Sequence, residues 1–258
     1  MKTALRVAAV ALILALFLPA VPAVQAQEFE GNLRIRLIDV DVDRATVLKN
    51  VQASALLALP VEYLLQLKAR DGSPAVSTSL RTYLIKGRSI RLEADQGDES
   101  TFTLINLDEK TIKFVSPENE TYYEVSIPEL TRPLVPMLQL GGYTVRPLNQ
   151  TRTVNGVEAT GYEAVADDNR VRAWLTQKYP ALTRLLEELA HTIPAPTSTA
   201  EDRLLGLAQL GAPVLVQLLD MDGKKLDNYE VQEIISIREQ SLDSRLFLVP
   251  EGFQRVDH

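Results

Sequence analysis

The sequence predicts an α+β fold in which a strongly curved antiparallel β-sheet, a half-barrel, carries helices packed on its concave face. After Phe29 the dominant pattern alternates apolar and polar residues with a period of two, and turn-forming residues interrupt it about every ten residues. Three stretches with a helical apolar period lie between these strand-like runs. Because strand twist accumulates across a large sheet, a sheet of roughly eight or more strands curls instead of staying flat.

The first 26 residues predict a secretory signal peptide. Lys2 and Arg6 give a basic start, Val7 to Leu18 is apolar throughout, and Val24-Gln25-Ala26 ends in the small residues of a cleavage site. The apolar run is too short to span a bilayer comfortably, and no Cys follows it to carry a lipid anchor. We therefore expect residues 27–258 to form a single domain that is periplasmic or secreted.

Composition restricts the classes of partner. The leader holds two of the 27 basic residues and none of the 34 acidic ones, so 25 basic and 34 acidic residues remain, a net charge of −9 with His neutral. This balance argues against nucleic acid, which requires clustered Lys and Arg. The absence of Cys excludes disulfides and thiolate chemistry. No later run is long and apolar enough to predict a transmembrane span.

The first predicted strand changes parity partway along. Leu33, Ile35 and Leu37 alternate with polar residues, whereas Val40 and Val42 are the apolar positions after Ile38. A slip of one residue turns every side chain to the other face, so we expect either a β-bulge near Leu37–Ile38 or the end of pairing there.

Later strands are bounded by turn residues. The strongest hairpin signals are Asn155-Gly156 and Asp222-Gly223. The predicted strands include 81–85, 89–94, 121–127, 162–165, 171–176, 214–219 and 229–237, with shorter ones that begin at Phe102 and end at Phe114. Together they predict an antiparallel meander.

Helical insertions are expected at about 44–68 and 178–210. The first, from Ala45 to Leu67, should be split by Pro60. The second comprises Tyr179 to Ala190, with a leucine-rich face, and Thr199 to Leu210. These leucines are interpreted as core or, alternatively, as the inner face of a movable lid. The pair Glu187-Glu188 is expected on the solvated side of its helix.

Several blocks of the chain resemble an exported bacterial family, the domain of unknown function 4412. The blocks are Phe29-Glu30-Gly31, 83–91, 103–125, 155–157 leading to Gly161-Tyr162, 173–176, 211–213 and 241–253. The order of elements is similar to the carrier fold of the LolA and LppX proteins, which are exported half-barrels closed by helices that hold acyl chains. The resemblance implies no catalytic residues. Two departures are a longer segment from Asp39 to Thr82 and Ala159 at a position where relatives often have Cys.

Motifs for catalysis or metal binding are weak throughout. Asp39-x-Asp41-x-Asp43 begins like a calcium loop, but Arg44 and Asn50 replace the required Gly and Glu. A Ser-His-Asp triad would have to use His191, and no G-x-S-x-G motif is present. The other histidine is the last residue, and no zinc-ligand spacing exists. We therefore predict no enzyme, no catalytic residues, no metal and no cofactor.

The predicted function is binding or carriage of a hydrophobic ligand, a lipid or a lipoprotein acyl chain, in the cell envelope. The residues expected to line an apolar cavity are Leu33, Ile35, Leu37, Ile90, Leu92, Leu104, Trp174, Leu182 and Leu186. Trp174 is interpreted as a core residue or as a wall of that cavity. The alternative is a non-catalytic structural or protein-interaction module of the envelope, with a filled core and an envelope protein as partner. The two functions differ in the volume they leave between helices and sheet.

Overall fold

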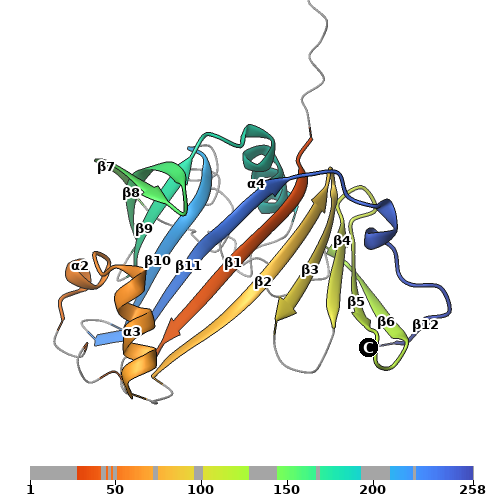
Figure 1. Cartoon of the computed structure of the whole chain (residues 1–258), viewed down its shortest axis with the longest axis horizontal. Helices are drawn as coiled ribbons and strands as arrows, with labels where there is room; N and C mark the ends of the chain where they lie inside the picture. The colour runs from red at the N-terminus through yellow and green to blue at the C-terminus, as the bar shows by residue number, and fades with distance from the viewer. Residues whose placement is uncertain are drawn as a thin grey trace, which may run out of the picture.

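One curved sheet of twelve strands dominates the described part of the chain. The computed structural model describes residues 28–41, 45, 48, 51–71, 75–95, 101–127, 144–166, 169–192, 210–222 and 225–257 (Figure 1). The strands are β1 (Glu30–Val40), β2 (Val76–Lys86), β3 (Ser89–Asp95), β4 (Phe102–Asn106), β5 (Thr111–Ser116), β6 (Thr121–Ser126), β7 (Thr144–Val154), β8 (Val157–Ala166), β9 (Asn169–Thr176), β10 (Ala212–Asp222), β11 (Lys225–Glu239) and β12 (Gln254–Arg255). The helices are α2 (Ala53–Leu56), α3 (Val61–Asp71), α4 (Pro180–Thr192) and the short 3-10 helix η3 (Ser244–Phe247).

Strand β1 lies at the centre of the sheet and joins two antiparallel meanders. Strands β2 to β6 follow one another on one side of β1, and β11 back to β7 follow on the other side. The short β12 adds in parallel to the outer edge of β6. The prediction of a large, curved and mainly antiparallel sheet is thus confirmed.

Local turn chemistry and helix patterns account for several correct predictions. The Asn155-Gly156 turn joins β7 to β8 with φ values of 47° and 80°, the left-handed conformation that both residues tolerate. Helix α3 begins at Val61, directly after Pro60, and the leucine-rich stretch forms α4. The helix expected to begin at Ala45 is wrong in its first part, because Ala45, Leu48 and Val51 are not helical and α2 spans only Ala53–Leu56. The signal peptide, Gly223, Asp43, Arg44 and the helix expected at 199–210 up to residue 209 lie outside the described residues.

The parity change in β1 reflects burial of both faces, so the predicted irregularity at Leu37–Ile38 is wrong. The register between β1 and β2 is unbroken from Glu30 opposite Lys86 to Val40 opposite Val76. The one irregularity in β1 lies between Arg34 and Ile35, opposite β11. The apolar residues before Ile38 belong to one core cluster, and Ile38 and Val40 belong to another on the opposite face. The apolar pattern shifts because a different element covers the strand from Ile38 onward, and not because of a bulge.

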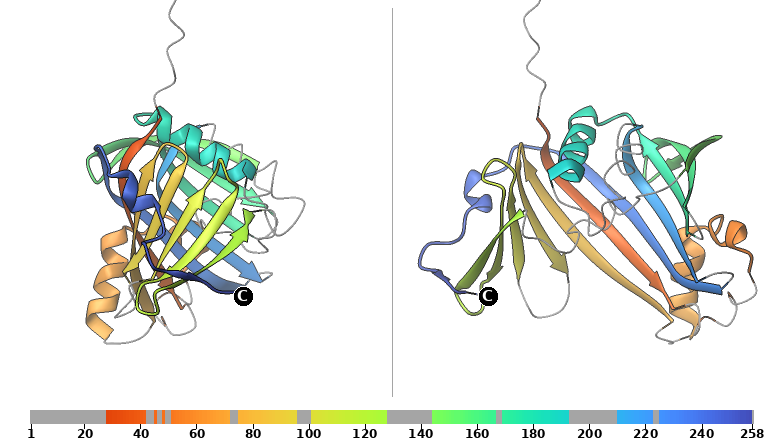
Figure 2. Two further views of the ribbon diagram at one scale, coloured as in Figure 1. Left: turned by 90° about the vertical axis from the view of Figure 1, so that its right-hand side faces the viewer. Right: turned by 180° about the vertical axis from the view of Figure 1, so that it is seen from behind.

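We name the two faces by the helices that cover them. On the α4 face, Leu33, Ile35 and Leu37 share a cluster with the leucines of α4. On the α3 face, Ile38 and Val40 share a cluster with α2 and α3. Both views of Figure 2 place α4 at the upper end of the sheet and α3 at the lower end. The expectation that all helices share one face therefore does not hold, because α3 and α4 pack on opposite faces.

Polar side chains of the sheet fix the turn between α2 and α3. Each of three adjacent strands donates one hydrogen bond to a carbonyl oxygen at the end of α2 or after it: Arg172 to Leu57 at 3.0 Å, Gln217 to Leu59 at 3.1 Å and Tyr229 to Leu56 at 3.0 Å. Gln217 also donates to the Tyr229 hydroxyl at 3.1 Å. These side chains supply donors at a helix end, where the helix itself has too few backbone donors for its last carbonyls.

The C-terminal segment, residues 240–256, forms a strap over the α3 face at the far end of the sheet. Near its start, the Leu242 amide donates a hydrogen bond to the Glu30 carboxylate at 2.6 Å. Near its end, the Val256 amide donates to the backbone carbonyl of Tyr122 at 2.9 Å. Val249 and Phe253 of the strap pack on a third apolar cluster formed by Phe102, Leu104 and Val115. The strap thus covers side chains that would otherwise face water.

The Tyr229 hydroxyl should contribute measurably to stability. Tyr229→Phe leaves the Leu56 carbonyl without this donor and is expected to lower the free energy of unfolding by about 1–3 kcal/mol in chemical denaturation. Tyr63→Phe is the matched control, because Tyr63 is 36% exposed on α3. Equal stability of the two variants would contradict the role assigned to Tyr229.

The strap should loosen in acid through Glu30. The hydrogen bond from the Leu242 amide, with Lys86 nearby, lowers the pKa of Glu30 below its ordinary value of 4.5. A lowered pKa in the folded state stabilises the protein above 4.5, and this contribution disappears as the pH falls through the lower value. Glu30→Gln should therefore be less stable than wild type at pH 7 and should match it at low pH. Glu118→Gln, in an exposed turn, should match wild type at both.

Candidate ligand-binding site

Helix α4 presents a continuous leucine face to the sheet. Pro180 occupies the first helical position, where its missing amide hydrogen costs nothing. Leu182, Leu185, Leu186 and Leu189 recur at three- and four-residue spacing, and all four are buried. The helix therefore docks through one apolar stripe.

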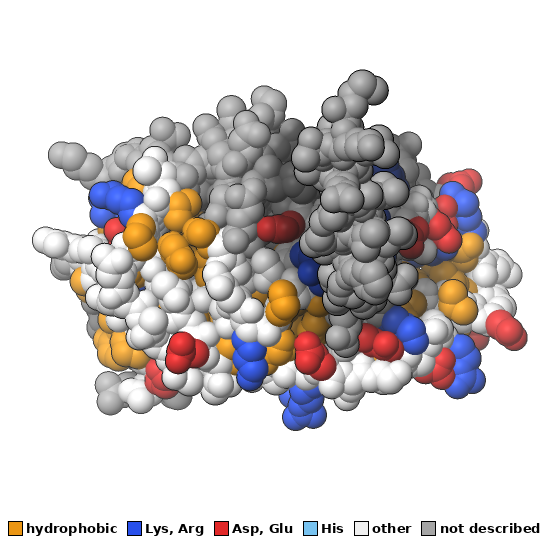
Figure 3. Space-filling model, turned by 90° about the horizontal axis from the view of Figure 1, so that it is seen from above, with side chains coloured by type: hydrophobic (Ala, Val, Ile, Leu, Met, Phe, Trp, Pro, Cys, Tyr) orange, Lys and Arg blue, Asp and Glu red, His pale blue; other side chains and the backbone are white. Residues whose placement is uncertain are grey.

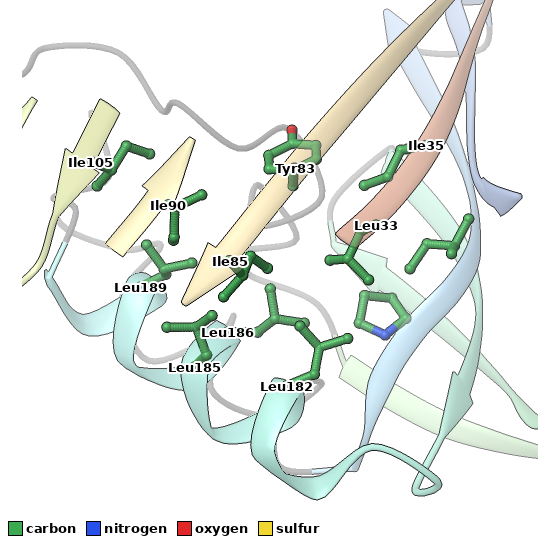
Figure 4. A pocket seen from close by; sticks show the side chains of 12 residues that line it. Leu33, Ile35, Tyr83, Ile85, Ile90, Ile105, Leu182, Leu185, Leu186 and Leu189 are labelled. Carbon is green, nitrogen blue, oxygen red and sulfur yellow. The ribbon is translucent and has the colours of Figure 1, made fainter. Parts of the chain in front are cut away.

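The sheet surface beneath α4 is built from six strands. It consists of branched aliphatic side chains together with Tyr83 and Pro213: Leu33 and Ile35 of β1, Tyr83 and Ile85 of β2, Ile90 of β3, Ile105 of β4, Pro213 of β10 and Ile234 of β11. We call the contact between this surface and the four leucines the α4 seam (Figure 4).

The α4 seam is nearly filled. Its cavity has a volume of about 30 Å³. A single water needs roughly 10–15 Å³ of such volume, and pockets for small ligands typically measure about 300–1,000 Å³. In this arrangement the seam has room for water but not for an alkyl chain.

The structure brings together five of the nine residues expected to line an apolar cavity. Leu33, Ile35, Ile90, Leu182 and Leu186 all line the α4 seam. Leu37 is buried in the same cluster, and Leu92 packs against that cluster while partly exposed, but neither lines the cavity.

Leu104 and Trp174 lie on the α3 face, so their predicted place in the cavity is corrected. In β4 both Leu104 and Ile105 are buried, and it is Ile105 that faces the seam while Leu104 packs beneath the strap. Trp174 packs in the α3-face cluster opposite Gly161, where a Cβ would lie 2.9 Å from the indole ring. The Arg152 guanidinium lies 5.0 Å from the centre of that ring. Trp174 is therefore a core residue.

A polar hollow adjoins the α4 seam. It has a volume of about 210 Å³ and lies between the start of β1, the β2–β3 turn and α4. Its charged lining residues are Glu28, Arg88, Arg184 and Glu188, and Leu185 lines both the hollow and the seam. Sequence reasoning missed this hollow because its residues come from three distant segments.

Arg88 is the central charge of the hollow. Its guanidinium forms an ion pair with Glu188 of α4 and lies 2.6 Å from the Asp108 carboxylate. Although desolvation opposes the charged form, these two carboxylates raise the pKa of Arg88. The sequence suggested that Glu188 points into solvent; instead it ties α4 to the β2–β3 turn.

The described residues show neither a metal site nor a membrane-spanning helix. Within them, no three His, Asp or Glu side chains are grouped so that they could share a metal ion. None of the described helices combines the length and apolarity needed to cross a membrane. Acidic and basic side chains are intermixed on the part of the upper surface that is described (Figure 3). His191 lies in α4, but its side chain is outside the described set.

Comparisons with known proteins give no family. No protein-family model and no curated protein matches the chain. Among solved structures, an uncharacterized conserved protein from Thermus thermophilus is similar over 88% of this chain and 90% of its own, at 8% identity and a TM-score of 0.41. A structure of PNGF-II has 11% identity and a TM-score of 0.36; the alignment covers 88% of this chain but only 31% of that one. Similarity this low carries no argument about function.

Truncating a seam leucine tests how firmly α4 is docked. Leu182 is fully buried, so Leu182→Ala should cost about 2–5 kcal/mol of unfolding free energy and enlarge the cavity. Leu248→Ala is the control, since Leu248 is 61% exposed and surface changes usually stay within about 0.5 kcal/mol. Similar values for both variants in chemical denaturation would mean that α4 is not packed on the sheet as described.

Proposed function

We propose that this protein binds the alkyl chain of a hydrophobic ligand in the α4 seam, and that α4 shifts outward to admit it. The observation that carries the proposal is the composition of the seam. Twelve side chains from α4 and the sheet line it, and Tyr83 is the one among them with a polar side-chain group. A surface of this kind recognises hydrocarbon through burial alone and needs no catalytic group.

The three elements that cover the sheet are fixed in different ways. Three side-chain hydrogen bonds hold the α2–α3 turn, and backbone hydrogen bonds to β1 and β6 anchor the strap. Helix α4 docks through its leucines, and among its polar contacts is the Arg88–Glu188 pair, whose side chains are 38% and 32% exposed. Exposed ion pairs contribute only about 0–1 kcal/mol. Breaking this pair is therefore a small part of the cost of moving α4.

The magnitudes favour a sliding helix over a detached one. A ten-carbon chain gains about 8 kcal/mol on leaving water, at about 0.8 kcal/mol per methylene. Exposing four leucines costs about 6–12 kcal/mol, at roughly 1.5–3 kcal/mol each. Complete undocking of α4 would consume most or all of the gain. A chain inserted between α4 and the sheet keeps the leucines covered by the ligand, and binding remains favourable.

The remaining expectations fit this proposal. We propose that residues 1–26 direct export, that the protein works without catalysis in the periplasm or outside the cell, and that it belongs with the domain of unknown function 4412. In this proposal the sheet is a LolA-like half-barrel, α4 is the helix on its concave face, and the ligand is a lipid or a lipoprotein acyl chain.

One observation favours the alternative, an envelope module with a filled core that binds another protein. The cavity of about 30 Å³ is what such a module requires. The two functions differ in whether the seam opens to hydrocarbon, so a binding measurement separates them.

A polar substitution inside the seam should weaken binding of an alkyl probe. Titration calorimetry with 1-decanol is expected to give saturable binding to wild type. Leu186→Gln should weaken it at least about tenfold, because an amide without partners is costly to bury against an alkyl chain. Leu65→Gln on α3 is the control, since Leu65 packs in the cluster of the opposite face.

Two results would contradict the proposal. If wild type binds no 1-decanol, the seam does not open and the filled module is the better description. If Leu65→Gln weakens binding as much as Leu186→Gln while both variants remain folded by circular dichroism, the site lies elsewhere.

A further inference from the structure

The polar hollow beside the α4 seam assigns a chemical class to the ligand. We propose that the ligand is a single-chain amphiphile with an anionic headgroup, and that this headgroup binds Arg88 in place of Glu188 and thereby releases α4. This inference rests on the proposed function, because it requires an alkyl chain in the seam.

The seam and the hollow are adjacent. Leu185 lines the seam on one side and the hollow on the other. The seam has apolar walls, whereas the hollow has two arginines and two glutamates in its lining. An amphiphile with its chain in the seam would meet the hollow at its polar end. The hollow already measures about 210 Å³, so it can admit a headgroup before α4 moves.

The β2–β3 turn positions Arg88 for anion binding. Gly87 has φ of 58°, a conformation favoured by glycine, and a Cβ there would collide with the Glu28 carboxylate. The turn thus places the Arg88 guanidinium between the β4–β5 turn and α4, where it contacts the carboxylates of Asp108 and Glu188. A guanidinium presents its donors as a planar fork that suits carboxylate and phosphate alike.

A bound headgroup would compete with Glu188 for Arg88. An anionic headgroup on Arg88 takes the place of the Glu188 carboxylate, and the two anions repel each other. Glu188 lies three residues after Leu185 and directly before Leu189, so its displacement acts on the part of α4 that closes the seam. The pair is partly exposed, which keeps the cost of exchange small. Binding of the headgroup and opening of the seam are therefore coupled.

The test compares probes of equal chain length. Wild type is expected to bind decanoate and decyl phosphate about tenfold or more tighter than 1-decanol, since hydrogen bonds to charged groups are stronger than those to neutral ones. Arg88→Gln should make the affinities for the anionic probes and for 1-decanol about equal, while 1-decanol still binds. Glu188→Gln should tighten 1-decanol binding, because it removes the ion pair between Arg88 and α4 without adding an anion site. Arg34→Gln, an exposed arginine of β1 outside the hollow, is the control and should leave all affinities unchanged.

The outcomes distinguish the two proposals. If no probe binds, the proposed function itself fails. If 1-decanol binds as tightly as decanoate, or if Arg88→Gln weakens both probes equally, the alkyl site stands and the anion site is overturned. If acetate or inorganic phosphate alone competes with decanoate at equal concentration, the hollow binds free anions, and the amphiphile assignment is overturned. A greater affinity for decanoate or for decyl phosphate identifies a carboxylate or a phosphate headgroup, respectively.

Discussion

The whole structure depends on β1 burying one face before Ile38 and the opposite face from Ile38 onward. This strand pairs with β2 along its full length and with β11 on its other side, so it joins the two meanders into one sheet. Its side chains before Ile38 supply the core beneath α4, and those from Ile38 onward supply the core beneath α3. A strand whose buried face changes partway along requires a cover on each side of the sheet, and α4 on one side and α2 with α3 on the other are those covers.

The covers follow from the order of elements along the chain. Helices α2 and α3 come directly after β1 and return to the face that Ile38 and Val40 present. The strap comes after β11 and crosses to the opposite edge, where it pairs with β6 and covers the cluster around Phe102. Both pack on the same face of the sheet, at opposite ends. The α4 face receives its described helix from the connection between β9 and β10.

Local signals in the sequence predicted several turns and helices correctly, but they did not predict which face of the sheet each side chain occupies. Asn155-Gly156 and the leucines of α4 were predicted correctly because a turn and an amphipathic helix are set by neighbouring residues. In β4, Leu104 and Ile105 are adjacent and both buried, so alternation alone cannot decide which of them faces α4. The strap decides it, and the strap is about 140 residues away in sequence. The Arg88–Glu188 pair was missed for the same reason, since its partners come from a turn and a helix far apart in the chain.

The difference between the covers also decides where ligand chemistry can enter. Moving the α2–α3 turn would leave side-chain donors of β9, β10 and β11 without these partners. Tyr229 is one of them, and burial already raises the pKa of its hydroxyl to about 12. Moving the strap would break backbone hydrogen bonds at both of its ends. In the proposed function, α4 moves by exchanging one partly exposed carboxylate, Glu188, for another anion at Arg88. An apolar seam whose cover is held in this way favours a ligand that carries its own charge, because the headgroup supplies the interaction that the departing Glu188 gives up.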